Sequence, residues 1–442
     1  MRLVSTTINP KLKLGFLLLL GSITASAQEN SPYSRYGLGD IFPGQHIINR
    51  GLGGVSAAYR DGLGQSVNFY NPATYSSLSL VTYDIGIAID NRTLRSAEPV
   101  NKFSSTNFTP SYVALGLPLS KKRKIGLVFG LRPLSKINYS ILENKRIPNI
   151  DSVSTLYEGS GGLYQGFVGL GKRWGGLSLG VNAGYSFGRK ETNSRVIFRN
   201  DTVSYHYANS SNVSSYNNFA LSGGMQYQFN VSKNSLLRLG VQGHLKQTLN
   251  ASQDVTKETF YYDVNGSVTR LDSAFEQKDN KGTIQLPASY TAGIAYETQT
   301  KEKLSRMLLS AEYESTKWSN YRFFGQPDKL IDNWQMRFGA QLSPDYLKAQ
   351  TFWSRVTYRT GFFYGKDYIN ADGNELKEYG ITLGAGFPII KRSNYSNQYS
   401  NIHTAFEFGK RGSKVNNITE NFFRFSVGFS LSDVWFIKRR YD

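Results

Sequence analysis

The chain has 442 residues and a formal net charge of +19, and it contains 29 tyrosines, 27 phenylalanines, 43 glycines, 13 prolines and no cysteine. The lack of cysteine excludes disulfides, thiolate metal sites and an acylated lipoprotein anchor. No run of about eighteen apolar residues follows the N-terminus, which excludes a helical membrane protein. The abundance of Tyr, Phe and Gly favours strands with tight corners over helices.

The first 27 residues have the pattern of a secretory signal peptide. Three cations precede the apolar stretch Leu14–Leu20, and Ala25-Ser26-Ala27 forms an A-x-A-type cleavage site before Gln28. We therefore expect residues 1–27 to be removed and the mature protein to begin near Gln28. A buried N-terminal helix is the alternative interpretation.

The mature chain remains strongly basic. Subtracting the three signal-peptide cations from +19 leaves +16. Export argues against nucleic acid as a partner. We instead expect lysines and arginines in turns and loops to contact the anionic lipid surface of the outer membrane.

Residues 28–79 lack regular alternation. They contain Arg50-Gly-Leu-Gly-Gly-Val-Ser-Ala-Ala-Tyr-Arg60 and, further on, Asn68-Phe-Tyr-Asn-Pro-Ala-Thr-Tyr75. Pro72 biases the preceding Asn71 away from helical geometry, so we predict a break in the chain there.

From Val81 onward, apolar and polar residues alternate with a period of two, which predicts strands. In the first segment Val81, Tyr83 and Ile85 alternate with Thr82 and Asp84. Most segments have about ten residues or more, enough for a tilted strand to cross the hydrocarbon layer. We count about fourteen segments. They begin near Val81, Tyr112, Ile125, Leu163, Leu177, Phe219, Leu237, Ile284, Leu309, Trp334, Val356, Tyr379, Thr404 and Phe423.

The connections distinguish a membrane barrel from a soluble β-sandwich, which also alternates. Short turns are predicted at Ser120–Lys124, Lys172–Gly176 and Val231–Ser235. Long polar links are predicted at Asn91–Thr106, Leu142–Gly159, Arg189–Asn217 and Lys246–Gly282. Short turns at one rim and long loops at the other are typical of outer-membrane barrels, and a sheet in lipid must close on itself. The predicted fold is all-β, a transmembrane antiparallel β-barrel of about fourteen strands over residues 80–432.

The polar faces of the predicted strands carry charges of both signs. The residues expected to face the lumen are Asp84, Arg132, Arg238, His244, Glu297, Glu312, Glu314, Arg337, Arg355, Arg359, His403, Glu407 and Arg424. Because an isolated buried charge is costly, these groups should pair. They form either a structural salt-bridge network that stiffens the barrel, or a polar conduit or latch that holds a plug.

Gly and Ser dominate the remaining inward positions and leave room for a filler, which we predict to be residues 28–79. The glycine-rich stretch, interpreted as a small-residue helix, is followed by Asn71-Pro72-Ala73. Together they resemble the N-terminal hatch of the FadL-like long-chain fatty-acid outer-membrane transporter family. Leu286-Pro-Ala-Ser-Tyr-Thr-Ala-Gly293 also resembles a recurring strand of that family. The resemblance spans the mature chain, but its specific motif is confined to Arg50–Thr74.

The resemblance implies a fourteen-stranded barrel and a fatty-acid-like ligand. It implies that Asn71-Pro72-Ala73 ends the hatch and turns the chain into the first strand. The hatch residues it singles out are Arg50, Gly51, Gly53, Gly54, Asn71, Pro72 and Ala73. The glycines would allow close packing against the wall; alternatively, they only make a tight turn.

Two features depart from the family pattern. Thr74 stands where the family commonly has glycine, and the charged lumen does not match the apolar pocket that a greasy ligand needs. Apolar hatch residues such as Leu52, Val55 and Phe69 are candidates for lining such a pocket.

Sequence patterns of catalysis are missing. The four histidines (His46, His206, His244 and His403) lack metal-ligand spacing, and no nucleophile elbow, phosphate loop or HExxH motif is present. We expect neither an enzyme nor a cofactor. For the tail, residues 433–442, the closing strand ends near Leu431 or continues through Trp435.

Two functional hypotheses follow. The first, favoured by the resemblance, is passive uptake of hydrophobic or amphipathic small molecules, gated by the hatch. The second, favoured by the inward charges, is a sealed accessory subunit of an outer-membrane protein assembly or secretion complex, with other outer-membrane proteins as partners.

Overall fold

The computed structural model describes residues 31–97, 100–148, 151–199, 205–299, 305–344, 351–370, 373–389, 399–413 and 416–433. The predicted signal peptide and residues 434–442 of the predicted tail, including Trp435, lie outside these ranges. Among the described residues, no helix is both long and apolar enough to cross a membrane.

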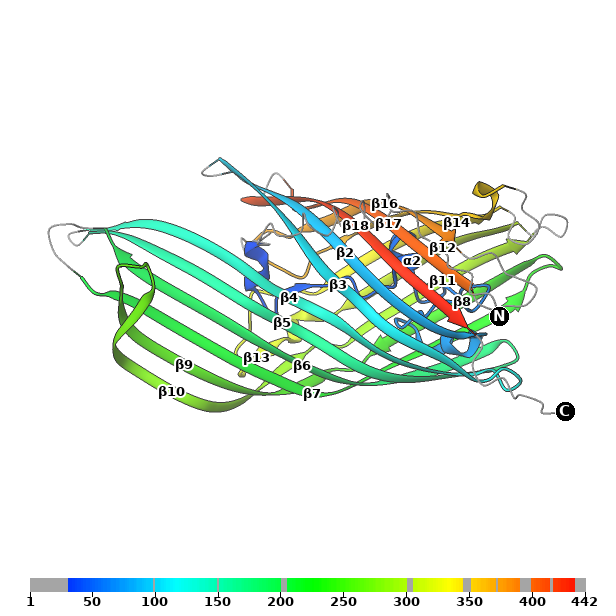
Figure 1. Ribbon diagram of the computed structural model, residues 1–442, viewed down its shortest axis with the longest axis horizontal. Coiled ribbons are helices and arrows are strands. Elements are labelled where there is room, and N and C mark those ends of the chain that lie inside the picture. The colour runs from blue at the N-terminus through cyan, green and yellow to red at the C-terminus, as the bar shows by residue number, and fades with distance from the viewer. Residues whose placement is uncertain are drawn as a thin grey trace, which may run out of the picture.

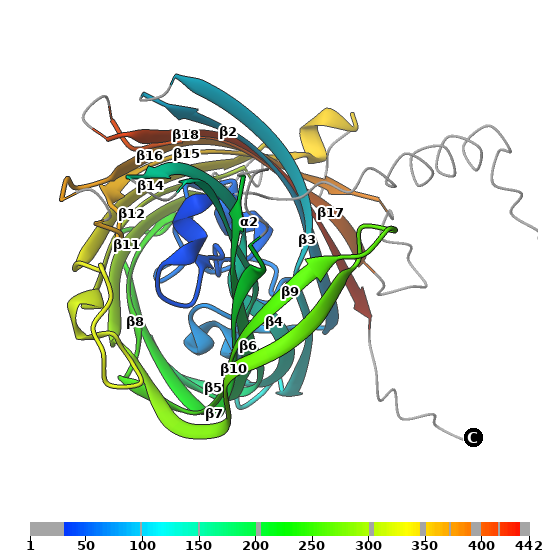
Figure 2. The same ribbon diagram turned by 90° about the vertical axis from the view of Figure 1, so that its left-hand side faces the viewer.

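The strands form one closed antiparallel sheet that surrounds the N-terminal segment (Figures 1 and 2). Its wall strands are β2 (Val81–Ser96), β3 (Asn101–Ser120), β4 (Ile125–Ile147), β5 (Asp151–Trp174), β6 (Leu177–Phe198), β7 (Tyr207–Asn230), β8 (Ser235–His244), β9 (Gln247–Tyr262), β10 (Val268–Leu286), β11 (Ser289–Gln299), β12 (Arg306–Thr316), β14 (Asn333–Ser343), β15 (Thr357–Lys366), β16 (Lys377–Pro388), β17 (Tyr399–Arg411) and β18 (Ile418–Asp433). Strand β18 pairs with β2, which joins the last strand to the first.

The predicted count of fourteen barrel strands is confirmed. Strands β8 and β9 form one barrel strand interrupted at Leu245 and Lys246, and β10 and β11 form another, interrupted at Pro287 and Ala288. The alternating pattern explains the wall. On β2, Ile85 is 42% exposed on the outer face, whereas Asp84 is fully buried on the inner face.

Over the described residues, most of the predicted long loops are instead continuations of the strands. Strands β4 to β7 have 22 to 24 residues, whereas β12 and β14 have 11. One side of the barrel therefore extends far beyond the other (Figure 1). The prediction failed because the extended parts, such as Asn209–Asn212 in β7, are polar on both faces. With water on both sides, a strand has no reason to alternate, and inter-strand hydrogen bonds alone maintain it.

The described part of the N-terminal segment lies inside the barrel, as the fold prediction required (Figure 2). We call residues 31–79 the plug. It contains η2 (Pro32–Arg35), β1 (Asp40–Ile41), α2 (Ile47–Arg50) and η3 (Pro72–Ser77). The expected glycine-rich helix does not form: α2 ends at Arg50, and Gly53 and Gly54 adopt φ angles of 70° and 91°. These left-handed conformations suit glycine and cannot continue a helix.

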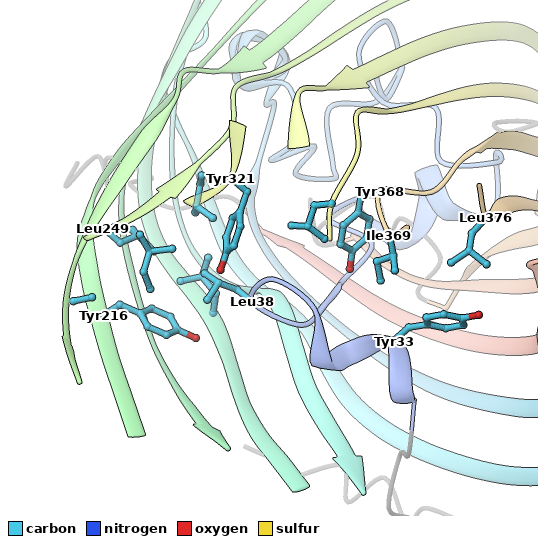
Figure 3. Close-up of a cluster of buried hydrophobic side chains, with 13 residues drawn as sticks. Tyr33, Leu38, Tyr216, Leu249, Tyr321, Tyr368, Ile369 and Leu376 are labelled. Atoms are coloured by element: carbon cyan, nitrogen blue, oxygen red, sulfur yellow. The ribbon is translucent and has the colours of Figure 1, made fainter. Parts of the chain in front are cut away.

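Two loop segments pack against the plug near the long-strand end of the barrel. One, residues 317–332, contains η4 (Trp318–Asn320) and β13 (Arg322–Phe323), which pairs with β10. The other, described over residues 367–370 and 373–376, joins it through a bridge between Ile369 and Leu330. Side chains from both segments pack with the plug and the wall in one apolar cluster, whose labelled members in Figure 3 are Tyr33, Leu38, Tyr216, Leu249, Tyr321, Tyr368, Ile369 and Leu376.

Candidate functional site: the plug–wall interface

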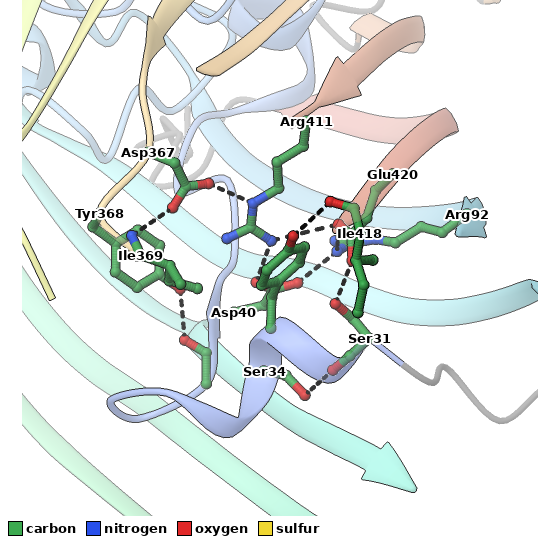
Figure 4. Close-up of polar contacts among 12 residues, drawn as sticks. Ser31, Ser34, Asp40, Arg92, Asp367, Tyr368, Ile369, Arg411, Ile418 and Glu420 are labelled. Carbon is green, nitrogen blue, oxygen red and sulfur yellow. Dashed lines mark hydrogen bonds and ion pairs between the residues drawn. The ribbon is translucent and has the colours of Figure 1, made fainter. Parts of the chain in front are cut away.

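An ion cluster beside the apolar cluster binds the start of the plug to three wall strands and a loop (Figure 4). Asp40 of β1 accepts from Arg411 Nη1 at 2.9 Å and from Arg92 Nη1 at 2.5 Å. Arg411 also donates to Asp367 and lies 3.5 Å from Glu420 Oε2. All five side chains are nearly buried. The interaction with Arg411 and Arg92 therefore takes place largely away from solvent.

Asp40 makes the docking of the plug sensitive to acid. Burial alone would raise its pKa, but the charges of Arg411 and Arg92 hold the pKa below its ordinary value of 3.8. A carboxyl group with a depressed pKa stabilises the fold fully above its ordinary pKa, and the contribution disappears as the pH falls through the lowered folded-state value.

We therefore predict that the protection of residues 31–50 from proteases is retained from pH 7 down to about pH 4 and is lost below that pH. The Asp40→Asn variant, which lacks the charge, should be less protected at pH 7 and should change less on acidification. Limited proteolysis of both proteins across this pH range measures the effect. Parallel pH curves for the two proteins would show that Asp40 does not hold the plug.

A ladder of ion pairs continues from α2 along the wall. Arg50 Nε donates to Glu407 Oε1 at 2.5 Å, and Glu407 Oε2 accepts from Arg424 Nη1 at 3.0 Å. Arg424 Nη2 then lies 2.9 Å from Asp90 Oδ2, which also accepts from Arg92. Arg92 therefore joins this ladder to the ion cluster around Asp40. Burial lowers the pKa of Arg50, and Glu407 counteracts this effect.

Asp84 provides a third attachment, to two separate parts of the plug. Its Oδ1 lies 2.9 Å from His46 Nε2, and its Oδ2 accepts from the backbone N–H of Val67 at 2.9 Å. The other ring nitrogen of His46 accepts from the amide of Ile48 at 3.1 Å. The imidazole therefore lies between the Asp84 carboxylate and the backbone of α2.

Glu312 of β12 holds the plug backbone directly. Its Oε2 accepts from the amides of Ser56 at 2.7 Å and Ala57 at 2.6 Å, while Oε1 accepts from Arg337 Nη1 at 2.8 Å. Arg337 Nη2 also pairs with Glu314 at 2.5 Å. One wall carboxylate therefore satisfies two buried plug amides as well as a guanidinium.

Replacing Glu312 by alanine is predicted to lower the free energy of unfolding by about 2 kcal/mol, because two buried amides lose their acceptor. Arg337 retains Glu314, which limits the loss. Chemical unfolding of the purified protein, followed by tryptophan fluorescence, measures this. Glu276→Ala is the control because Glu276 is exposed. Equal stabilities of the two variants would contradict the assigned role of Glu312.

Backbone packing complements the ionic contacts. The turn from Gly51 to Gly54 lies against three wall glycines: a Cβ on Gly339 would lie 2.6 Å from the carbonyl oxygen of Leu52, and a Cβ on Gly361 would overlap the amide nitrogen of Gly53. A Cβ on Gly384 would lie 2.9 Å from Gly51 Cα. The wall glycines therefore let two backbones approach closely, which side chains would prevent.

The Asn71-Pro72-Ala73 motif occupies a second glycine-lined patch of the wall. Asn71 is extended at φ −117°, caps η3 by accepting from the Ala73 amide, and donates to the carbonyl oxygen of Ala57 at 2.7 Å. A Cβ on wall residue Gly224 would collide with Asn71, and one on Gly180 with Pro72. The predicted break at Pro72 is thus present, as the start of a 3-10 helix that leads towards β2.

The structure places most of the predicted lumen residues against the plug or against one another. Arg238 pairs with Glu297 at 3.3 Å, Arg359 donates to Gln341, and Arg132 donates to Gln165 and lies over the ring of Phe69. The residues found on the inner wall are Asp84, Arg132, Arg238, His244, Glu297, Glu312, Glu314, Arg337, Arg359, His403, Glu407 and Arg424. Arg355 differs, because it belongs to the short helix η5 (Trp353–Arg355) before β15 and donates to the carbonyl oxygen of Thr351 at 3.5 Å.

The ion cluster around Asp40 was not predicted from the sequence. Arg92, Arg411 and Glu420 lie on strand ends beyond the predicted membrane-crossing segments. Each shares the inward face of a predicted lumen residue on its own strand, so continuing the period of two by a few residues would have found them. No local signal placed Asp40 beside them.

A cavity of about 350 Å³ remains between plug and wall. Its lining mixes apolar residues such as Leu38, Leu163 and Leu286 with charged groups such as Arg50 and Glu314. Within the described ranges, no cluster of three or more His, Asp or Glu side chains is arranged to hold a metal ion. Because charged groups interrupt its apolar lining, the cavity is not a continuous apolar conduit.

The plugged, closed barrel is the architecture of FadL-like outer-membrane proteins. The chain is similar to the toluene transporter TodX of P. putida (TM-score 0.57, 14% identity, covering 89% of this chain and 99% of that chain). It is also similar to a FadL homologue of Pseudomonas aeruginosa (TM-score 0.56, 11% identity, 90% and 100%) and to the monoaromatic hydrocarbon channel CymD (0.50, 13%, 90% and 99%). At these identities the similarity shows the fold alone. No curated protein matches the sequence.

The family itself is identified by sequence. The family model of BamG matches residues 11–442, and the chain belongs to the BamG family. The FadL resemblance is therefore correct for the fold, while the family assignment is BamG.

Proposed function

We propose that this protein is a sealed accessory barrel subunit of an outer-membrane protein assembly complex. The observation that carries the proposal is the attachment of the plug: buried ion pairs and backbone hydrogen bonds tie it to wall strands around the barrel, and an apolar cluster covers it at the long-strand end. Breaking buried ion pairs is costly, so a plug held this way favours a closed bore over a gate.

Membership of the BamG family supports the same function. The family name associates it with the outer-membrane protein assembly (BAM) complex. A partner in such a complex would contact the outside of the barrel, where the tall wall formed by β4 to β7 offers surface beyond the shorter strands (Figure 1). We also propose the division into a hatch, residues 28–79, and a barrel, residues 80–432, with the hatch acting as a permanent seal.

Affinity purification from the native outer membrane tests the proposal. A tag inserted at Asn265 and Gly266, in the exposed turn between β9 and β10, leaves the barrel and plug unchanged. Mild detergent extraction followed by mass spectrometry should recover other outer-membrane assembly proteins in stoichiometric amounts. Recovery of a lone barrel, with the same tag placement and with bound fatty acid, would overturn the assembly function.

Passive uptake of hydrophobic compounds is the second candidate, and a split in the wall favours it. Strands β3 and β4 pair only from Val113–Leu131 to Ser120–Ile125. Beyond these residues, towards the long-strand end, the two strands are not paired with each other. There, plug strand β1 pairs with β4 instead, with Ile41 opposite Ser135. Transport through the split would require this plug segment to move.

A disulfide lock separates the two candidates. The chain has no cysteine, so an Ile41→Cys, Ser135→Cys variant introduces a single pair at opposed antiparallel positions. If the protein is a conduit, oxidation should block uptake of a hydrophobic compound by cells and reduction should restore it. If it is a sealed subunit, oxidation should leave both uptake and recovery of partners unchanged.

Deleting residues 28–79 should raise conductance in planar bilayers if the plug occludes the bore.

A further inference from the structure

A second, smaller cavity lies at the end of the barrel opposite the long-strand end. It has a volume of about 90 Å³ and is enclosed by plug residues Tyr59–Leu63 and by the ends of β12, β14, β15, β16 and β17. Its lining includes Arg60, Arg306, Arg355, Arg359 and His403. It is separate from the ion cluster and ladder that hold the plug.

The charge of this cavity is positive. Four arginines line it, whereas the lining carboxylates are Asp61 and Glu297. Both carboxylates have other partners: Asp61 accepts from the amides of Leu63 at 3.1 Å and Gln65 at 2.9 Å, and Glu297 pairs with Arg238 at 3.3 Å. With four arginines against two carboxylates, one of which also pairs with Arg238, the lining carries an excess of positive charge.

Two buried side chains of the lining hold polar atoms without a partner among the described residues. Arg359 is 8% exposed and His403 is 4% exposed. Arg359 Nη1 and both ring nitrogens of His403 have no hydrogen-bond partner in the part of the chain that the structure describes. A buried polar group without a partner is costly, so these atoms indicate a missing ligand or ordered water.

These atoms converge on one point. A Cβ built on Gly386 would lie 3.1 Å from Arg359 Nη1 and 3.3 Å from His403 Nδ1. Arg359 Nη1 and His403 Nδ1 therefore lie close to each other beside Gly386, where even a Cβ would be tightly packed. A tetrahedral oxyanion suits such a site, because it accepts hydrogen bonds from several directions, whereas a planar carboxylate is satisfied by one guanidinium fork.

We propose that this cavity binds a phosphate group, held by Arg359 and His403 at its inner end and by Arg355 at its outer end. At about 90 Å³ the cavity is roughly three times the ~30 Å³ that one water molecule takes in the liquid, so it can hold a group larger than a single water. The phosphate is either free inorganic phosphate or the head group of a phospholipid in the periplasmic leaflet. The site is independent of whether the protein belongs to an assembly complex.

The first test is binding of inorganic phosphate to the full-length protein, purified in phosphate-free detergent solution and titrated by calorimetry. Arg355→Gln and Arg359→Gln should each weaken binding by about tenfold or more, because each removes a charge-assisted hydrogen bond. Arg355 is half-buried outside the strands, so its replacement should leave folding intact even if Arg359→Gln does not fold. Arg322→Gln is the matched control, because Arg322 is also half-buried and lies at the opposite end of the barrel.

The second test identifies the source of the phosphate. The wild-type protein and the Arg355→Gln variant are incubated with phosphatidylglycerol vesicles, re-extracted and analysed by native mass spectrometry. Phospholipid retained by the wild type and lost in the variant assigns the site to a head group. Binding of inorganic phosphate without retained lipid assigns it to the free anion. If the wild type binds neither probe, or binds equally in all three variants, the cavity holds only water and the proposal is wrong.

Discussion

Replacing Arg411 by methionine is expected to lower the free energy of unfolding by about 3–5 kcal/mol, the cost typical of removing one partner from a buried ion pair. Arg411 is 6% exposed and is shared by Asp40, Asp367 and Glu420. Without it, three buried carboxylates face one another with Arg92 as the remaining cation beside two of them. The start of the plug should detach first, because Asp40 is its ionic anchor.

Unfolding in denaturant and protease sensitivity of residues 31–50 measure these two effects. Lys410→Met is the matched control, because Lys410 is the neighbouring cation on the same strand and lies on its other face. Adding Asp40→Asn to Arg411→Met should recover part of the lost stability, since the two residues interact directly. If Lys410→Met is as destabilising as Arg411→Met, the ion cluster does not hold the plug.

Replacing the wall glycine Gly361 by leucine is expected to displace the plug while leaving the barrel closed. The added side chain would overlap the backbone of Leu52 and Gly53, and backbone on both sides of the contact cannot move aside as a flexible side chain can. Overpacking of this kind costs about 3 kcal/mol. The plug turn should therefore separate from β14, β15 and β16.

Two measurements check this result. Limited proteolysis should cut the plug of Gly361→Leu faster than that of the wild type, and single-channel recording should show greater conductance. Gly166→Leu is the control, because a Cβ at this wall glycine meets no atom within 4 Å. Heat-modifiable gel migration shows whether each variant keeps a closed barrel. A Gly361→Leu plug as protected as that of Gly166→Leu would contradict the close packing that the structure shows.

Both predictions concern whether the plug is a seal or a gate. A gate must be able to move away from the barrel wall at a small cost in free energy. Each contact tested by these variants is instead expected to stabilise the bound plug by several kilocalories per mole. Asp40, Arg50 and Ser56 are held by separate wall partners, so full opening of the bore would break all three contacts. Large effects of both variants would therefore support the sealed subunit, and small effects would favour the conduit.

Much of the barrel could be predicted because its signal is local. The alternation of Ile85 and Asp84 reports which side of one strand meets lipid, and this holds whatever the strand pairs with. The structure places Glu312, Glu407 and Arg424, which have the same parity on their strands, among the buried residues of the inner face. The alternation predicted fourteen strands and an internal filler because lipid on one side and a polar interior on the other act on every residue along each strand.

Other features depended on residues far apart in the chain. Arg50 meets Glu407 across 357 positions, and Asp40 meets Arg411 across 371, so no window of sequence contains both partners. Strand extensions that are polar on both faces, such as Asn209–Asn212, acquire their structure from neighbouring strands rather than from their own pattern. Local sequence therefore determined that the chain forms a barrel with a polar, filled interior. Which charges pair, and how firmly the filler is held, was decided by the closure of the sheet around the plug, because only closure brings those side chains within bonding distance and removes them from water.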